Sequence, residues 1–202
     1  MDKTELIQSL KAKGFHERII SAFERVRRED FVPENMKKLA YEDIALPLSE
    51  TETISQPSTI ALALSLLKVK ENNKVLEIGS GCGYVSALMS EIVGERGKVV
   101  GVEISEKLFE TSLKNLEGYQ NITLYNRNGK LKNEEAPFNR ILLSAAVEQV
   151  PQDILEQLDE NGILVAPVGS DYMQNLVAMR KISGKIVVEK EIPGFIFVRF
   201  IE

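Results

Sequence analysis

The chain has 202 residues, enough for one domain with a sizeable core, and its 44% hydrophobic and 27% charged residues are ordinary for a globular protein. The net charge of −5 argues against a protein that coats nucleic acid, and no apolar stretch is long enough for a membrane span. One cysteine and one histidine leave no disulfide and no recognisable zinc ligand set. Because the start also lacks the pattern of a signal peptide, we expect a cytoplasmic protein without a metal.

The first part of the chain is predicted to be mainly helical. Apolar residues recur at helical spacing over residues 4–27, with an interruption at Gly14. Pro33 and Pro47 bound an irregular stretch. Residues 58–67 are apolar on almost every side, which predicts a buried helix.

Arg25, Arg27 and Arg28 form a small basic cluster at the end of the first helical region. Acidic residues stand next to them, so we interpret the cluster as a solvated helix end rather than an anion-binding patch. The single histidine, His16, is expected to be a surface or helix-packing residue.

From Lys74 onward, short apolar runs alternate with helical patterns, which predicts βαβ units and a mostly parallel sheet. Strands are predicted at Lys74–Ile78, Lys98–Ile104, Ile122–Tyr125, Arg140–Ser144, Ile163–Val168 and 195–201, with an antiparallel hairpin of residues 174–181 and 185–190. Helices are predicted after the first of these strands, at 106–117 with Leu108, Leu113 and Leu116, and from Pro151 to Asn161-Gly162. The sheet is therefore expected to carry helices on both faces and an antiparallel strand near the C-terminus.

A glycine-rich turn links the first predicted strand to the next helix. Gly79, Gly81 and Gly83 follow Glu77, with Ser80 between them. The third glycine comes one residue too early for the dinucleotide pattern G-x-G-x-x-G. An anionic Glu77 would repel a pyrophosphate but suits the ammonium group of a methionine moiety. The turn therefore favours S-adenosylmethionine over a dinucleotide.

Glu103 ends the second predicted strand, where a carboxylate can accept hydrogen bonds from both ribose hydroxyls of a nucleoside. This acid alone would serve NAD equally well, so an NAD-dependent oxidoreductase stays an alternative. A second alternative is a turn that only packs helix on strand, with both acids solvated. Cys82 is expected to be a small buried residue rather than a nucleophile.

The pattern E-x-G-x-G-x-G resembles motif I of the class I methyltransferases. Other segments resemble the protein-L-isoaspartate O-methyltransferase family, and they are Val26–Pro33, Ala40–Asp43, Leu46–Leu48, Thr53–Pro57, Ser144–Ala146, Leu158, Gly162, Leu164–Gly169 and Val198–Phe200. The resemblance runs from about residue 19 to the end. It implies a single Rossmann-like domain with a seven-stranded sheet, in which residues 1–57 form a helical segment that covers the substrate and residues 58–202 form the cofactor-binding core.

The resemblance also implies the activity, which is methyl transfer from S-adenosylmethionine to the α-carboxylate of L-isoaspartyl residues in damaged proteins. S-adenosylhomocysteine is then the product, and isoaspartyl peptides and proteins are the partners of a protein that we expect to be monomeric. Ser55 carries over as the active-site residue. The implied cofactor-binding residues are Thr53, Ile54, Glu77, Gly79, Ser80, Gly81, Gly83, Glu103, Ile104, Asn128, Gly129 and Ser144. The implied substrate-binding residues are Thr53, Ser55, Gln56 and Val168.

The proposed chemistry needs no general base, because a carboxylate with a pKa of about 4 is already ionised at neutral pH. A serine hydroxyl can donate one hydrogen bond that fixes the approach of this carboxylate. The alternative for Ser55 is a helix N-cap, since it stands just before a predicted apolar helix.

Four residues depart from the family pattern. Glu50 and Glu52 place negative charge near a site for a carboxylate, while Asn128 and Asn139 replace aspartates. Asn128 can still accept a hydrogen bond, without charge. These departures keep two alternatives open, namely a methyltransferase with another acceptor and a non-catalytic cofactor-binding module.

Overall fold

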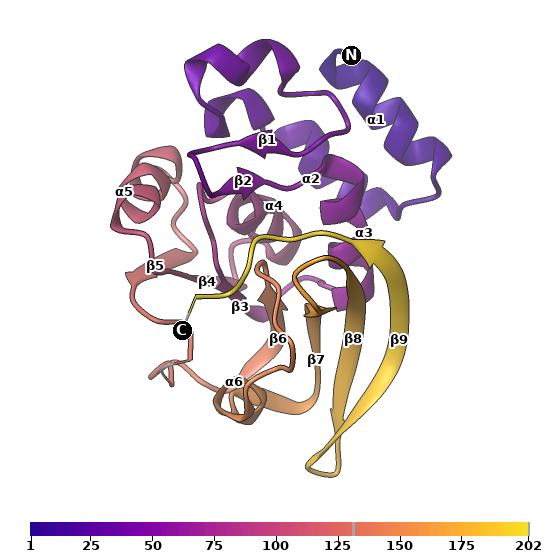
Figure 1. Ribbon diagram of the computed structural model, residues 1–202, viewed down its shortest axis with the longest axis vertical. Coiled ribbons are helices and arrows are strands. Elements are labelled where there is room, and N and C mark those ends of the chain that lie inside the picture. The colour runs from indigo at the N-terminus through magenta and orange to yellow at the C-terminus, as the bar shows by residue number, and fades with distance from the viewer. Residues whose placement is uncertain (131, 202) are drawn as a thin grey trace.

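The computed structural model describes residues 1–130 and 132–201. Its main sheet has seven strands in the order β5-β4-β3-β6-β7-β8-β9 (Figure 1). The strands are β3 (Lys74–Ile78), β4 (Lys98–Glu103), β5 (Ile122–Asn126), β6 (Phe138–Leu143), β7 (Leu158–Gly169), β8 (Gln174–Ile182) and β9 (Lys185–Phe195). Neighbours from β5 to β7 are parallel, and β8 is antiparallel to both of its neighbours. The predicted α/β fold class is confirmed.

The strand order reverses at β3, which places a ligand site at a defined edge of the sheet. The chain passes from β3 to β4 and β5 on one side and then returns to pair β6 with the other side of β3. In open sheets of this kind ligands bind at the carboxyl ends of the strands, beside the reversal. The glycine turn that follows β3 lies at this edge.

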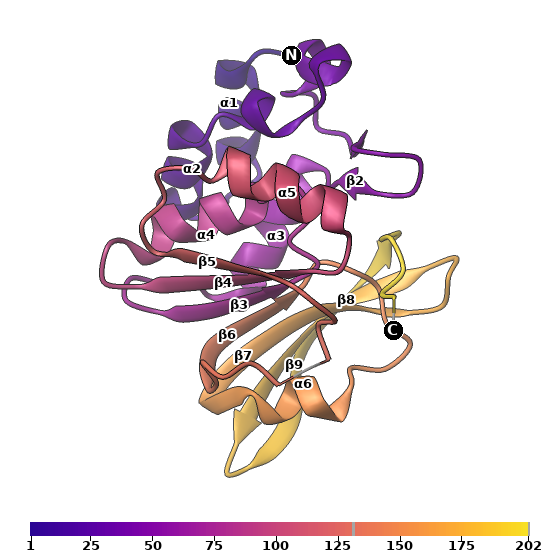
Figure 2. The ribbon, with the colours of Figure 1, turned by 90° about the vertical axis from the view of Figure 1, so that its left-hand side faces the viewer.

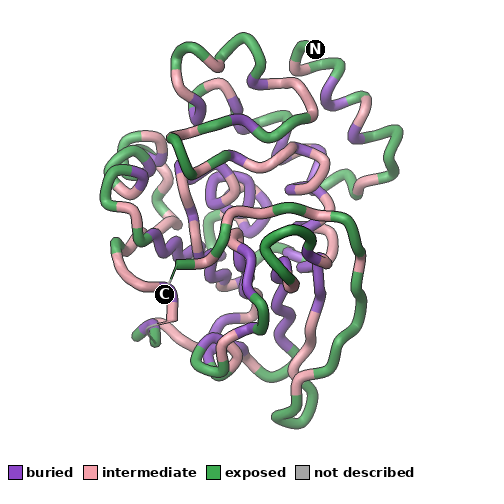
Figure 3. The backbone as a smooth tube through the Cα atoms, viewed as in Figure 1, coloured by how far each residue is buried: buried purple, intermediate pink, exposed green. Residues whose placement is uncertain are grey.

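Helices cover both faces of the sheet (Figure 2). They are α3 (Pro57–Leu67), α4 (Tyr84–Val93), α5 (Glu106–Asn115) and α6 (Gln152–Glu156), with α6 alone on its face in this view. An apolar core lies on each face of the sheet, and successive residues of β3 point into different cores: Val75 is buried in one apolar cluster and Leu76 in the other. Figure 3 shows buried residues along the central strands and exposed ones along β9. None of the helices in the described ranges is both long and apolar enough to cross a bilayer.

The N-terminal segment forms a helical layer beside α3 and α4 with a short hairpin. Its elements are α1 (Lys3–Ala12), α2 (Glu17–Arg25), the 3₁₀ helices η1 (Arg28–Phe31) and η2 (Glu34–Leu39), and strands β1 (Leu46–Pro47) and β2 (Thr53–Ile54). The break at Gly14 between two helices is as predicted. His16 caps α2, since its Nδ1 accepts a hydrogen bond from the backbone N–H of Arg18 at 3.1 Å.

The predicted boundary between α6 and β7 is wrong. The helix ends at Glu156, and β7 begins at Leu158 instead of Ile163. Leu158 pairs with Phe138 of β6, whereas the next pair joins Ile163 to Arg140, so the residues between them bulge out of the ladder. The turn signal Asn161-Gly162 therefore marks a bulge inside a strand.

The prediction of a last strand at the end of the chain is also wrong. Residues 195–201 are not a strand beyond Phe195, since the described residues after Phe195 form just one bridge, between Arg199 and Ala146. The apolar alternation instead reflects side chains that line a cavity. In the region of α5, Leu108 and Leu116 are buried, whereas Leu113 is 50% exposed.

Candidate active site

A cavity of about 650 Å³ opens at the carboxyl ends of β3 and β4, in the size range of small-molecule sites. The β1–β2 hairpin, the glycine turn and the C-terminal segment all contribute to its wall. Figures 1 and 2 show the hairpin and the yellow C-terminal segment on the same side of the molecule. The cavity therefore joins parts of the chain that are far apart in sequence.

Many of the predicted site residues lie in this wall, namely Thr53, Ser55, Gln56, Gly79, Gly81, Glu103, Ile104, Gly129 and Ser144. Six others do not, and these are Ile54, Glu77, Ser80, Gly83, Asn128 and Val168. The structure thus brings the hairpin, the turn and the end of β4 around one space, with the remaining predicted residues outside its wall.

The glycines of the turn divide into two roles. The backbone N–H of Gly81 donates to Oε2 of Glu103 at 2.7 Å, and Gly81 lines the cavity with a φ of +55°. Gly83 faces away, since a Cβ there would come within 2.7 Å of Cδ1 of Leu116 on the α5 side. Gly83 is the N-cap of α4 and has a φ of +88°. The alternative of a glycine that only packs helix on strand therefore describes this third glycine and not the other two.

The carboxylate of Glu103 is held from both sides while it remains in the cavity wall. Besides the bond from Gly81, its Oε1 accepts a hydrogen bond from the backbone N–H of Ser105 at 2.9 Å. The residue is only 6% exposed. Two backbone donors fix the carboxylate in one orientation and leave lone pairs for a ligand.

Glu77 lies behind the wall, 1% exposed. Its Oε2 accepts a hydrogen bond from the hydroxyl of Ser86, and its Oε1 accepts one from Ser144 at 2.9 Å. Burial raises the pKa of Glu77 to about 8, although both serine hydrogen bonds act in the opposite direction. Because Ser144 lines the cavity, it links this carboxylate to the wall.

Ser55 follows β2 and does not cap α3, so the N-cap alternative is wrong. The N-cap position belongs to Gln56, and Pro57 opens the helix. The backbone N–H of Ser58 is instead satisfied by Oδ1 of Asp43 at 2.8 Å. The hydroxyl of Ser55 thus takes no part in capping α3, and the residue lines the cavity.

The interpretation of Arg28 as part of a solvated helix end is also wrong. Its side chain is 0% exposed, and its Nη1 donates to the backbone carbonyl of Ser55 at 2.9 Å. Arg25 and Arg27 are exposed and form surface ion pairs, as expected. The cluster splits because the chain turns into η1 directly after Arg27.

The C-terminal segment from Gly194 to Ile201 is the main part of the wall that sequence reasoning missed. Backbone bonds from Ala146 to Val198 and from Phe200 to Ala146, each 2.8 Å, hold it. The side chain of Gln174 accepts a further bond from the backbone N–H of Phe197 at 2.8 Å. The alternating aromatic residues were a signal, but they were assigned to a strand.

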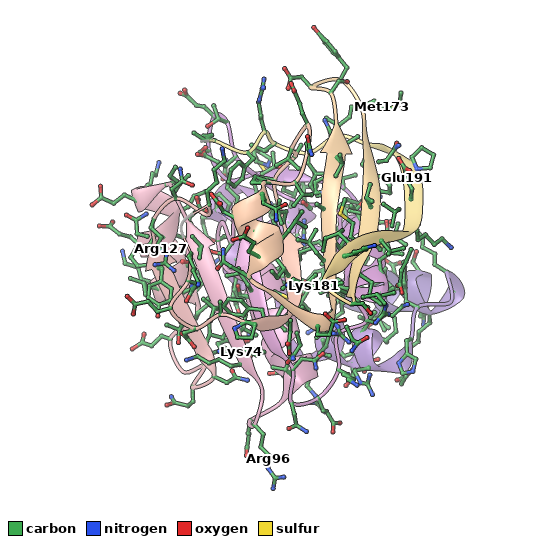
Figure 4. The ribbon with its side chains drawn as sticks, turned by 90° about the horizontal axis from the view of Figure 1, so that it is seen from below. Lys74, Arg96, Arg127, Met173, Lys181 and Glu191 are labelled. Atoms are coloured by element: carbon green, nitrogen blue, oxygen red, sulfur yellow. The ribbon has the colours of Figure 1, made fainter. Side chains whose placement is uncertain are left out.

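Arg127 was also missed. It lines the cavity, its guanidinium carbon lies 4.7 Å from the ring centre of Tyr125, and its Nε and Nη2 have no hydrogen-bond partner in the described part of the chain. Figure 4 shows Arg127 on the β5 side of the sheet and Met173 beyond the start of β8. Arg127 stands directly before the predicted residues Asn128 and Gly129, but no role of its own was predicted for it from the sequence.

The predicted residues outside the wall have other surroundings. Ile54 is buried in the larger apolar cluster, and Val168 packs against the smaller one. Oδ1 of Asn128 accepts a hydrogen bond from the backbone N–H of Lys130 at 2.9 Å. Cys82 is buried as expected, and burial raises the pKa of its thiol to about 11, so the thiolate form is suppressed.

Comparison with known proteins agrees with this geometry. The family described as protein-L-isoaspartate(D-aspartate) O-methyltransferase matches residues 1–202. The protein-L-isoaspartate O-methyltransferase of Methanococcoides burtonii is 41% identical over 199 residues, which cover 97% of this chain and 98% of the relative.

Two solved structures are similar over nearly the whole chain. A protein-L-isoaspartate O-methyltransferase has a TM-score of 0.91 and 31% identity, and the match covers 98% of this chain but 65% of that one. A Plasmodium falciparum protein, described as a protein-L-isoaspartate O-methyltransferase in complex with S-adenosyl-L-homocysteine, has a TM-score of 0.87 and 26% identity, covering 99% and 98%. The chain belongs to the protein-L-isoaspartate(D-aspartate) O-methyltransferase family.

Proposed function

We propose that the cavity binds S-adenosylmethionine and an L-isoaspartyl residue together, and that the protein methylates the α-carboxylate of that residue as a repair enzyme. The observation that carries this proposal is that Ser55 and Glu103 line one cavity, although one follows β2 and the other ends β4. A methyl donor and its acceptor must meet in a single enclosed space from which water is excluded.

The residues at the glycine turn fit the cofactor. Gly79 and Gly81 line the cavity without side chains, and Glu103 offers a fixed carboxylate to a ribose. Ser144 and Glu77 behind it supply polar surroundings for an ammonium group, and the Glu77 carboxyl gains its negative charge when that group binds. The bound cofactor supplies an electrophilic methyl group on a sulfonium.

The protein contributes orientation rather than proton transfer. The acceptor carboxylate has a pKa of about 4 and reaches the site ionised. We assign Ser55 to donate one hydrogen bond to it, with Thr53 and Gln56 as neighbouring wall residues. A single neutral donor suits the reaction, because the negative charge of the acceptor disappears as its ester forms.

Glu52 favours a second candidate, a methyltransferase of the same fold with another acceptor. This acidic residue lines the cavity beside the place proposed for a carboxylate.

We also propose that residues 1–57 act as the segment that covers the substrate, and that the protein works as a monomer in the cytoplasm without nucleic acid. The net charge of −5 supports the absence of a nucleic-acid partner, and the single cysteine supports a cytoplasmic location.

The test is methylation of an isoaspartyl peptide and its aspartyl counterpart with labelled cofactor. We expect label in the isoaspartyl peptide only. Ser55→Ala is expected to lower kcat about 10- to 100-fold with unchanged affinity for S-adenosylhomocysteine, whereas Ser65→Ala, in α3 and away from the cavity wall, serves as the control. Equal labelling of both peptides, or of neither, would reject the assignment and favour the second candidate.

A further inference from the structure

Arg28 carries a charge into the interior between the N-terminal layer and the cofactor-binding core. The residue is 0% exposed, and its Nε has no hydrogen-bond partner in the described ranges. A buried guanidinium without a full set of partners is costly, and apolar residues of similar size often replace such groups without loss of stability. Stability alone therefore gives little reason for an arginine at this position.

The remaining nitrogens of Arg28 reach both ends of the β1–β2 hairpin. Nη1 donates to the backbone carbonyl of Ser55 at 2.9 Å, directly after β2. Nη2 donates to the carbonyl of Ile44 at 3.3 Å, shortly before β1 begins at Leu46. A planar guanidinium can hold two carbonyls at a fixed spacing, whereas a lysine ammonium is a single point of charge.

The same guanidinium also contacts the core on the cofactor side. Its central carbon lies 5.3 Å from the ring centre of Tyr84, the first residue of α4. Tyr84 follows Gly83 directly and is 2% exposed, and Phe31 packs edge-on against its ring at 5.3 Å. Arg28 thus connects the carbonyl of Ser55 to the residue that follows the glycine turn.

We propose that Arg28 is a positioning residue for methyl transfer, which sets the Ser55 backbone relative to the glycine turn by bonding both ends of the hairpin. This inference rests on the proposed role of Ser55 in orienting the acceptor. Even a small displacement of a reacting group from its ideal position lowers the rate strongly, although both ligands still bind. Loss of the two hydrogen bonds from the Arg28 guanidinium should therefore lower kcat and leave cofactor affinity unchanged.

The test compares Arg28→Lys and Arg28→Met with Phe31→Leu as a matched control. Phe31→Leu weakens packing against the same Tyr84 ring but keeps both bonds to the hairpin. Each variant is assayed for kcat and KM with an isoaspartyl peptide, for S-adenosylhomocysteine affinity by calorimetry, and for thermal unfolding. If Arg28→Met does not fold, Arg28→Lys alone provides the comparison.

We expect both Arg28 variants to lose about ten-fold or more in kcat with nearly unchanged cofactor affinity. Phe31→Leu should lose stability and keep kcat within about two-fold. The inference is overturned if the Arg28 variants lose no more kcat than Phe31→Leu, or if cofactor affinity falls by the same factor as kcat. Absent turnover by the unmodified protein would reject the proposed function as well, whereas normal turnover by Arg28→Lys rejects this inference alone.

Discussion

Ser144 donates a 2.9 Å hydrogen bond to Oε1 of Glu77, which lies in β3, and Ser144 directly follows the parallel neighbour β6 at the point where the strand order reverses. Glu77 ends in a fully buried position, while Ser144 reaches the cavity. The pair therefore places a carboxyl group with a raised pKa directly behind the wall of the proposed cofactor site.

The pKa of Glu77 makes the stability of the ligand-free protein depend on pH. Burial raises this pKa from 4.5 to about 8, so the folded protein retains a proton that the unfolded chain releases above its ordinary pKa. The resulting contribution is fully present below pH 4.5 and is lost as pH rises to about 8. We expect the free energy of unfolding, measured with denaturant, to fall across this window relative to Glu77→Gln, which keeps a neutral side chain.

The comparison with Glu77→Gln isolates this residue because the other titrating groups are common to both proteins. The gap between the two stability curves should change up to pH 8 and then level off. Parallel curves across the whole window would mean that Glu77 is ionised in the folded protein at neutral pH.

Binding of the reaction product should release a proton from the same residue. An ammonium group near Glu77 favours the charged form of the carboxylate and lowers its pKa. At pH 7 the ligand-free carboxyl, with a pKa of about 8, is mostly protonated and must ionise. Calorimetry with S-adenosylhomocysteine in two buffers of different ionisation enthalpy measures this release. We expect close to one proton in the unmodified protein and none in Glu77→Gln.

Local patterns predicted the elements well because the parallel strands and their helices carry their own hydrophobic period. Lys74–Ile78 is a strand as predicted, and the pattern over 58–67 predicts α3 to within one residue. The bulge at Asn161 depends on pairing with Phe138, a contact between distant parts of the chain that no local pattern encodes. A turn signal inside a strand therefore looked like a helix end.

The site was predictable where motifs provide backbone geometry and was missed where tertiary packing provides it. Gly81 and Glu103, both assigned to the cofactor site from their motifs, line the same cavity. Arg28 looked like a surface charge, since its neighbours are charged and only the packing of η1 against Tyr84 buries it. The C-terminal residues around Phe197 reach the cavity through Gln174, whose role no motif describes.

A side chain at Gly83 should destabilise the protein, for a packing reason rather than a catalytic one. A Cβ at this position meets Cδ1 of Leu116 at 2.7 Å and also requires a φ of +88°. We expect Gly83→Ala to destabilise the fold by about 2–4 kcal/mol in denaturant unfolding. Gly14→Ala, between α1 and α2, is the matched control, since its φ is +79° and no atom lies within 4 Å of the added Cβ. Equal losses in both variants would show that backbone strain alone explains the effect.

Glu52 should weaken the binding of an anionic acceptor, because its carboxylate shares the cavity wall with Ser55. Glu52→Gln is expected to lower KM for an isoaspartyl peptide about two- to five-fold, and the gain should shrink as salt is added. Glu50→Gln is the matched control, since Glu50 is exposed on the same hairpin and outside the cavity wall. The same change in both variants would assign the effect to the general charge of the hairpin.

Gln174 should control how firmly the C-terminal segment closes the cavity. This buried side chain donates a hydrogen bond to the carbonyl of Ser170 and accepts one from the backbone N–H of Phe197, so a single residue joins the loop after β7 to the segment that lines the site. Gln174→Met keeps the volume similar and removes both bonds, which leaves the Phe197 N–H unpaired. We expect a loss of about 1–3 kcal/mol in stability.

Amide hydrogen exchange distinguishes a local opening from a general loss of stability in Gln174→Met. Exchange should accelerate at Phe197 and leave the amides of β3 protected, and KM for the cofactor should rise because the loosened segment forms part of the wall. Asn175→Ala, at the next position, loses an exposed hydrogen bond to Glu191 and should change neither property. Uniform acceleration across the sheet in Gln174→Met would mean that the side chain supports the fold as a whole and does not hold this segment in particular.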